Sequence, residues 1–165
     1  MNNKIILGTA QFGTKYGINN HTGKISKGKV FEIFETAILN GIDSLDTAEA
    51  YGDCYDLIKE FNLSNNFNFK LYSKLNSKNL HSIKSLNEYL LRSLDYLNQE
   101  YFEGYMFHSY EALKNYPYFY DDLLKIKEDG NIKNIGVSVY TNEDLNDIFN
   151  NYDQFDFIQA PFNLL

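Results

Sequence analysis

The sequence predicts a parallel α/β fold, a (β/α)8 barrel of which only about six of the eight βα units are present. Short apolar segments alternate with amphipathic helical segments along all 165 residues, a pattern typical of parallel βαβ units with right-handed crossovers. A doubly wound sheet is the main alternative. However, residues 13–17 (GTKYG), in the first strand-to-helix connection, do not match the G-x-G-x-x-G fingerprint of that fold.

The first unit shows the pattern most clearly. Residues 4–7 form a short apolar run before Gly8 and predict a strand. A helix follows, because apolar residues recur at i, i+3, i+4, i+7 and i+8. These residues are Val30, Ile33, Phe34, Ala37 and Ile38. Asn40 and Gly41 tolerate left-handed backbone and are expected to end the helix.

The same unit recurs along the rest of the chain. The predicted strands are 42–45, 69–73, 104–107, 135–139 and 155–160, and the predicted helices are 55–61, 83–97, 118–128 and 142–150. No low-complexity linker or long block of like charge separates two parts. We therefore expect residues 1–165 to form one incomplete barrel domain, two units short of the ~250 residues typical of this fold.

Composition excludes several classes of function. The formal charge of −7 disfavours nucleic acid and anionic membranes as partners. The chain has one cysteine, Cys54, so no internal disulfide can form, which fits a reducing cytoplasm. The apolar run near the N-terminus is too short for a signal peptide, and no segment approaches the ~20 apolar residues of a membrane span. A cytoplasmic location is therefore expected, and no metal site is predicted.

Polar residues stand where the predicted strands end. Asp46 follows the second strand, Lys74 the third and His108 the fourth, while Tyr51 lies in the loop after Asp46. In a parallel barrel these positions share the C-terminal rim, where active sites are built. Taken singly, each residue also has a structural interpretation: a helix cap for Asp46, packing for Tyr51, a solvated charge for Lys74 and a hydrogen-bonded rim residue for His108.

Taken together, the four side chains suit carbonyl reduction. A lysine ammonium beside a tyrosine is expected to lower the phenol pKa, and Asp46 can keep that lysine charged. A histidine can orient the carbonyl, so the set forms a general acid aimed at an oxygen that becomes an alkoxide. Protein side chains do not donate hydride, so a nicotinamide cofactor is implied.

Several segments resemble the aldo-keto reductases. They are residues 8–13 (GTAQFG), 42–52 (IDSLDTAEAYG), 92–94 (RSL), 136–140 (GVSVY) and 158–163 (IQAPFN). The resemblance implies a TIM barrel that binds NADPH, or NADH, across its rim and reduces a small-molecule carbonyl substrate. It also implies that Tyr51 is the general acid, Lys74 its partner and Asp46 the counter-ion of Lys74, while His108 orients the carbonyl.

The resemblance further implies a set of cofactor-binding residues. Ser138 and Gln159 would hydrogen-bond the nicotinamide carboxamide, and Gly8 and Thr9 would line the cofactor near the first strand. Tyr140 and Asn163 lie nearby by position. One departure is Val139, where the family often has Asn. A second is that the loops which grip the cofactor phosphates in the family lie beyond the sixth predicted strand.

Two other functions stay open at this stage. The chain could be a truncated or split barrel without catalysis, which acts through self-association or a partner chain that completes the barrel. Six strands without closure would leave the first and sixth strands with unpaired edges, which invite pairing with another chain. Lys74 could instead be a Schiff-base nucleophile, although that role does not explain why Asp46 and Tyr51 accompany it.

Overall fold

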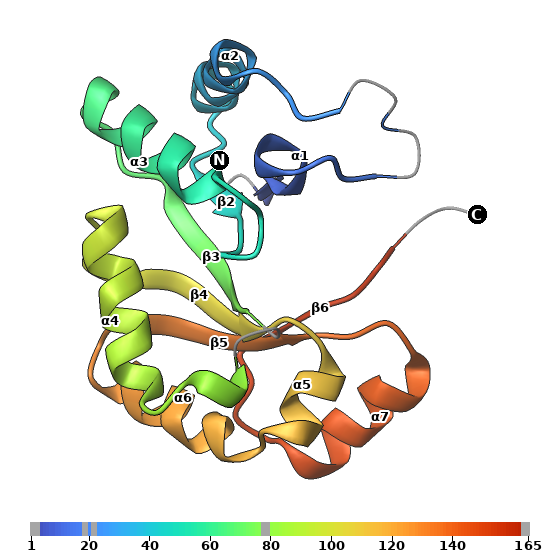
Figure 1. The fold of residues 1–165 in the computed structure, drawn as a ribbon. Helices are drawn as coiled ribbons and strands as arrows, with labels where there is room; N and C mark the ends of the chain where they lie inside the picture. The colour runs from blue at the N-terminus through green and yellow to red at the C-terminus, as the bar shows by residue number, and fades with distance from the viewer. Residues whose placement is uncertain (1–3, 18–19, 21–22, 77–79, 163–165) are drawn as a thin grey trace.

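The computed structural model describes residues 4–17, 20, 23–76 and 80–162. Its strands form a six-stranded parallel sheet whose order follows the chain, from β1 to β6. The strands are β1 (Leu7–Gly8), β2 (Ser44–Asp46), β3 (Lys70–Leu75), β4 (Phe102–Phe107), β5 (Ile132–Ser138) and β6 (Phe157–Gln159). In a doubly wound sheet the strand order reverses. Here the order follows the chain throughout, and the sheet curls (Figure 1). The fold is therefore part of a β/α barrel, as predicted.

Helices cover the outer face of the curled sheet (Figure 1). The five predicted helices correspond to α2 (Lys27–Leu39), α3 (Cys54–Asn65), α4 (Leu86–Leu97), α6 (Tyr118–Glu128) and α7 (Asn142–Asn151). Three further elements were not predicted: α1 (Ala10–Gly13), α5 (Tyr110–Asn115) and the 3₁₀ turn η1 (Leu80–Ser82). Each spans six residues or fewer, so it shows too little periodicity to be recognised.

Local side-chain chemistry defines several helix ends. Ser85, Ser109 and Thr141 are N-caps, and the side-chain oxygen of each accepts a hydrogen bond from the backbone N–H three residues later. These bonds satisfy donors that the first turn of a helix leaves free. At the other end, α3 and α4 stop at Asn66 and Asn98, which adopt the left-handed conformation that asparagine tolerates.

Alternation along the strands separates the core from the site. The outward side chains of the strands pack with the helices in one apolar cluster. Its buried strand members include Leu45, Leu71, Leu75, Tyr105, Phe107, Ile135 and Val137. The intervening residues point inward, and the strand register aligns Gly8 with Asp46 and Ser138 with Gln159. The same strands therefore supply an apolar outer core and a polar inner rim.

Two aromatic rings fill the barrel interior one layer below this rim. Tyr72 and Phe157 pack edge to face, with ring centroids 5.7 Å apart. They precede the rim residues Lys74 and Gln159 by two positions, so they share the inner face with them. Room for the Tyr72 ring exists because β4 has a glycine there: a Cβ on Gly104 would lie 2.3 Å from Cδ1 of Tyr72.

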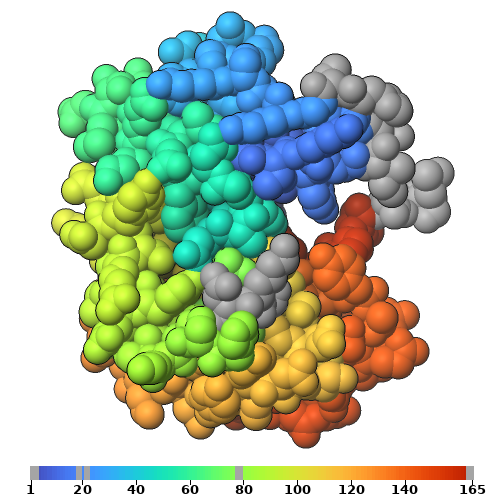
Figure 2. Space-filling view, in the orientation of Figure 1, coloured from blue at the N-terminus to red at the C-terminus, as the bar shows by residue number. Residues whose placement is uncertain are grey.

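The two ends of the sheet have one neighbouring strand each. Among the described residues, β1 pairs with β2 alone and β6 with β5 alone. The molecule is hollowed between the blue N-terminal segment and the orange and red C-terminal segment (Figure 2). In the described part of the chain, no helix is both long and apolar enough to span a bilayer.

Adding a methyl group at Gly104 should destabilise the barrel interior. We expect Gly104→Ala to lower the free energy of unfolding by about 1–3 kcal/mol, because the Tyr72 ring must move out of a packed position. Gly28→Ala is the matched control, since a Cβ there meets nothing within 4 Å. It should stabilise α2 by about 0.5–1 kcal/mol. Urea denaturation measures both changes, and equal midpoints for the two variants would contradict this account of the packing.

Candidate active site

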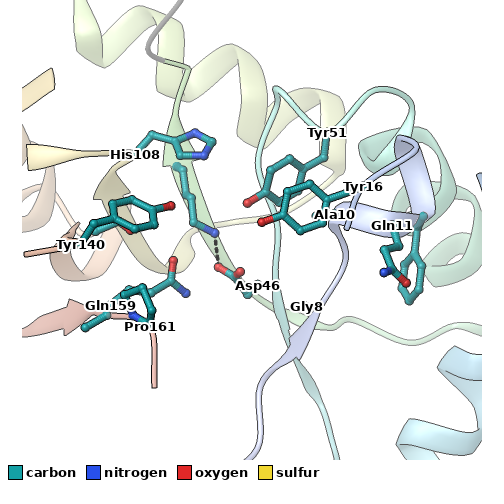
Figure 3. A pocket seen from close by; sticks show the side chains of 14 residues that line it. Gly8, Ala10, Gln11, Tyr16, Asp46, Tyr51, His108, Tyr140, Gln159 and Pro161 are labelled. Carbon is teal, nitrogen blue, oxygen red and sulfur yellow. Dashed lines mark hydrogen bonds and ion pairs between the residues drawn. The ribbon is translucent and has the colours of Figure 1, made fainter. Parts of the chain in front are cut away.

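The ends of five strands bring polar side chains to one pocket. Asp46 ends β2, Lys74 lies near the end of β3, His108 follows β4, Ser138 ends β5 and Gln159 ends β6. All five line a pocket of about 490 Å³ together with Gly8 and Tyr51. Figure 3 shows Tyr51 on one side of the pocket and His108 and Gln159 on the other. The structure therefore brings together every candidate site residue except Thr9.

An ion pair between a buried lysine and a partly buried aspartate lies in the pocket. The Lys74 ammonium donates a hydrogen bond to Oδ1 of Asp46 (Figure 3), and the side chains are 3% and 20% exposed. Burial lowers the pKa of Lys74, whereas the negative charge of Asp46 acts in the opposite direction. Asp46 thus offsets the cost of keeping an ammonium group away from water.

Tyr51 projects from the loop after β2 towards this ion pair. The Lys74 ammonium lies 5.3 Å from the centroid of the Tyr51 ring. Burial raises the pKa of Tyr51, and the charge of Asp46 raises it further. The predicted lowering of this pKa is therefore wrong, because burial disfavours the phenolate and the negative charge of Asp46 adds to this effect. Both effects favour the neutral phenol, the form that can donate a proton.

His108 faces Tyr51 across the pocket (Figure 3). The two rings pack edge to face, with centroids 5.9 Å apart. Burial lowers the pKa of His108, and the nearby positive charge of Lys74 lowers it further. Its Nδ1 atom is buried and has no hydrogen-bond partner within the described ranges. The environment therefore favours a neutral imidazole, with one nitrogen donor and one acceptor.

Ser138 and Gln159 lie side by side at the rim. They are paired in the register of β5 and β6, and the Val139 amide donates to the Gln159 carbonyl oxygen at 2.9 Å. Their hydroxyl and amide groups supply donors and acceptors, so they can bind a planar carboxamide. Gly8 faces the same pocket, and a Cβ there would meet nothing within 4 Å.

Thr9 occupies a different place from the one expected. It is fully buried, and its hydroxyl and backbone N–H each donate to the carbonyl oxygen of Asp46 at 2.9 Å. Thr9 thus ties β1 to the end of β2 and does not line the pocket. Cys54 is also buried, and burial raises the pKa of its thiol. Both features favour the packing interpretation of Cys54 over a reactive one.

Several pocket residues were not predicted, although two of them lie within the segments 8–13 and 158–163 that carry the family resemblance. Gln11 and Tyr16 line the pocket from α1 and the segment after it, and Pro161 lines it from beyond β6. These residues lie outside the strands, so strand-end reasoning could not find them. Tyr140, placed near the site by position, does line it, while Asn163 lies outside the described residues. Within the described ranges, no group of three His, Cys, Asp or Glu side chains could hold a metal ion.

Removing Asp46 should leave an uncompensated buried charge. We expect Asp46→Asn to cost about 3 kcal/mol of unfolding free energy at pH 7. It would also lower the pKa of Lys74 further below its ordinary value of 10.5. Between the folded and unfolded pKa values the unfolded chain binds more protons, so stability rises with pH there. The loss of unfolding free energy in Asp46→Asn should therefore shrink as the pH is raised from 7 towards 10. Urea denaturation at several pH values measures this change.

Asp43→Asn is the matched control for this prediction. It breaks the Lys70–Asp43 pair, whose side chains are about half exposed and 2.7 Å apart. Solvent screens such pairs, so the cost should stay below about 1 kcal/mol. An equal cost for the two variants, or an Asp46→Asn deficit that is constant with pH, would contradict the assigned role of Asp46.

Comparison with known proteins places the chain in a family. The Aldo/keto reductase family profile matches residues 4–165, whereas no curated protein matches in sequence. A Pseudomonas aeruginosa structure assigned to the aldo-keto reductases has 22% identity and a TM-score of 0.70, with 96% of this chain and 62% of that chain covered.

Two further structures agree on the fold. A Klebsiella pneumoniae aldo-keto reductase in complex with NADPH has 21% identity and a TM-score of 0.64, with 95% of this chain and 53% of that chain covered. The holo form of a Bacillus halodurans aldo-keto reductase has 17% identity and a TM-score of 0.66, with 98% of this chain and 54% of that chain covered. This chain thus spans roughly half to three-fifths of each structure, and it belongs to the aldo/keto reductase family.

Proposed function

We propose that the site reduces an aldehyde or a ketone with NADPH as the hydride donor and Tyr51 as the general acid. Family membership supports oxidoreductase chemistry. The observation that carries the proposal is that Tyr51 and His108, whose rings are in contact, line one pocket with the Lys74–Asp46 ion pair. Proton donors aimed at one point are what a developing alkoxide requires.

The rim offers a place for the nicotinamide. Ser138 and Gln159 supply hydroxyl and amide groups that fit its carboxamide, and Gly8 leaves the neighbouring wall open. When bound there, the cofactor supplies the hydride that reduces the carbonyl carbon. The solved Klebsiella pneumoniae relative is in complex with NADPH, which supports NADPH over NADH as the donor.

The protein groups then control the oxygen of the substrate. The Tyr51 hydroxyl and the imidazole N–H of His108 donate hydrogen bonds to the carbonyl oxygen and orient it. As negative charge develops on this oxygen, Tyr51 gives up its proton and becomes a phenolate. The Lys74 ammonium, 5.3 Å from the Tyr51 ring centroid, offsets part of the cost of this phenolate, although burial and the Asp46 charge keep the pKa of Tyr51 above its ordinary value. Asp46 keeps Lys74 protonated in its buried position.

Removal of the Tyr51 hydroxyl tests this mechanism. We expect Tyr51→Phe to lower kcat/KM for a reactive aldehyde at least 100-fold, because general acid catalysis contributes about 10²–10⁴-fold. NADPH affinity, followed by cofactor fluorescence, should stay the same. Tyr118→Phe removes an exposed phenol on α6 and is the matched control. Full activity of Tyr51→Phe would refute Tyr51 as the acid.

The sheet edges support a second candidate, in which another chain or a second copy pairs with β1 or β6. Each of these strands has one described neighbour, and Ile6, which precedes β1, is 43% exposed. Unpaired parallel edges beside apolar side chains favour such association. The Lys74 nucleophile considered above has no comparable support, because its ammonium is paired with Asp46.

A charge placed at the β1 edge should weaken self-association. We expect the protein to sediment as an oligomer at micromolar concentration, and Ile6→Lys to shift it towards monomer. Leu39→Lys is the matched control, since Leu39 is a highly exposed apolar residue at the end of α2. A wild-type protein that sediments as a monomer over the whole concentration range would contradict this second candidate.

A further inference from the structure

The backbones of two glycines are in close contact next to the backbone of Tyr51. Gly13 is the last residue of α1, and Gly52 follows Tyr51 in the loop after β2. A Cβ on Gly13 would lie 1.6 Å from the carbonyl oxygen of Tyr51, and a Cβ on Gly52 would lie 2.3 Å from the carbonyl oxygen of Gly13. Both distances are below any real Cβ contact, so neither position has room for a side chain.

The α1 side of this contact is anchored independently. At the start of α1, Thr9 donates two hydrogen bonds to the Asp46 carbonyl oxygen. Within α1, Phe12 is buried and packs edge to face on Phe34 of α2, with ring centroids 5.5 Å apart. Gly13 therefore holds a defined position relative to the end of β2, and α1 cannot retreat without breaking these contacts.

The Tyr51 side of the contact is a tight turn. The Tyr51 amide donates to the Ala48 carbonyl oxygen at 3.0 Å, and the Cys54 amide donates to the Tyr51 carbonyl oxygen at 3.2 Å. Gly52 has a φ of +61°, in the left-handed region that favours glycine. From this turn the Tyr51 ring points into the pocket (Figure 3).

We propose that Gly13 and Gly52 are positioning residues, and that their contact sets where the Tyr51 hydroxyl lies relative to Lys74 and His108. This inference rests on the proposed role of Tyr51 as the acid. A general acid must lie within hydrogen-bond distance of the oxygen it protonates. A misplacement of about 1 Å can lower the rate about 100-fold, so a direct backbone contact is a stringent way to fix the loop.

Gly13→Ala tests the proposal, because its new methyl group must push the Tyr51 backbone away from α1. We expect kcat to fall about 10- to 100-fold while the Kd for NADPH stays within about twofold. Gly28→Ala is the matched control and should change none of these values.

A second readout separates this proposal from the proposed function. In protein labelled with ¹³Cζ-tyrosine, the Tyr51 resonance, assigned with Tyr51→Phe, should shift in Gly13→Ala and stay unchanged in Gly28→Ala. If the wild-type protein shows no reductase activity, the proposed function fails, and this resonance alone decides whether the contact positions Tyr51. An unchanged resonance, or an unchanged kcat in an active protein, overturns the inference.

Gly52→Asn keeps the test decisive if Gly13→Ala does not fold. Asparagine tolerates the positive φ of this position, yet its Cβ would still lie 2.3 Å from the Gly13 carbonyl oxygen. The variant therefore displaces the same loop from the other side, and the same changes in kcat and in the Tyr51 resonance are expected. Loss of folding in both variants would overturn the proposal, because the contact would then serve the fold as a whole.

Discussion

The strict alternation of side chains along parallel strands is the constraint on which the rest of the structure depends. In β3, Leu71 and Leu75 point outward into the apolar cluster beneath the helices, while Tyr72 and Lys74 point inward. This strand therefore contributes to the outer core, to the aromatic layer of the interior and to the rim. A shift of one residue in register would place Lys74 in the core and an apolar residue in the site.

The electrostatics of the site follow from the depth at which this alternation places Lys74. Withdrawal from water penalises charged forms, so it lowers the pKa of Lys74 and His108 and raises that of Tyr51. Asp46 opposes this effect for Lys74 and reinforces it for Tyr51. Burial therefore favours the neutral forms of Tyr51 and His108. The negative charge of Asp46 favours the charged form of Lys74 beside them.

The loop that carries Tyr51 depends on a different kind of contact. No strand register places Tyr51, because it follows β2 in a turn held by its own backbone hydrogen bonds. The turn rests on α1, a helix of only four residues that is tied to Asp46 by Thr9 and to the core by Phe12. Strand geometry thus positions Lys74, Asp46 and the rim amide of Gln159, whereas the turn that carries Tyr51 is in backbone contact with α1.

Periodicity and position within a repeating unit are local properties, so they predicted the order of strands and long helices and the strand-end residues Asp46, Lys74 and His108. The sequence did not reveal α1, the buried role of Thr9 or the pocket residue Tyr16, since short irregular segments show no period. Tertiary structure alone decided the direction of the Tyr51 pKa shift and the Gly13–Gly52 contact. The pKa shift depends on segments distant in sequence that exclude water from Tyr51. The glycine contact depends on α1 and the loop after β2 lying close together in space.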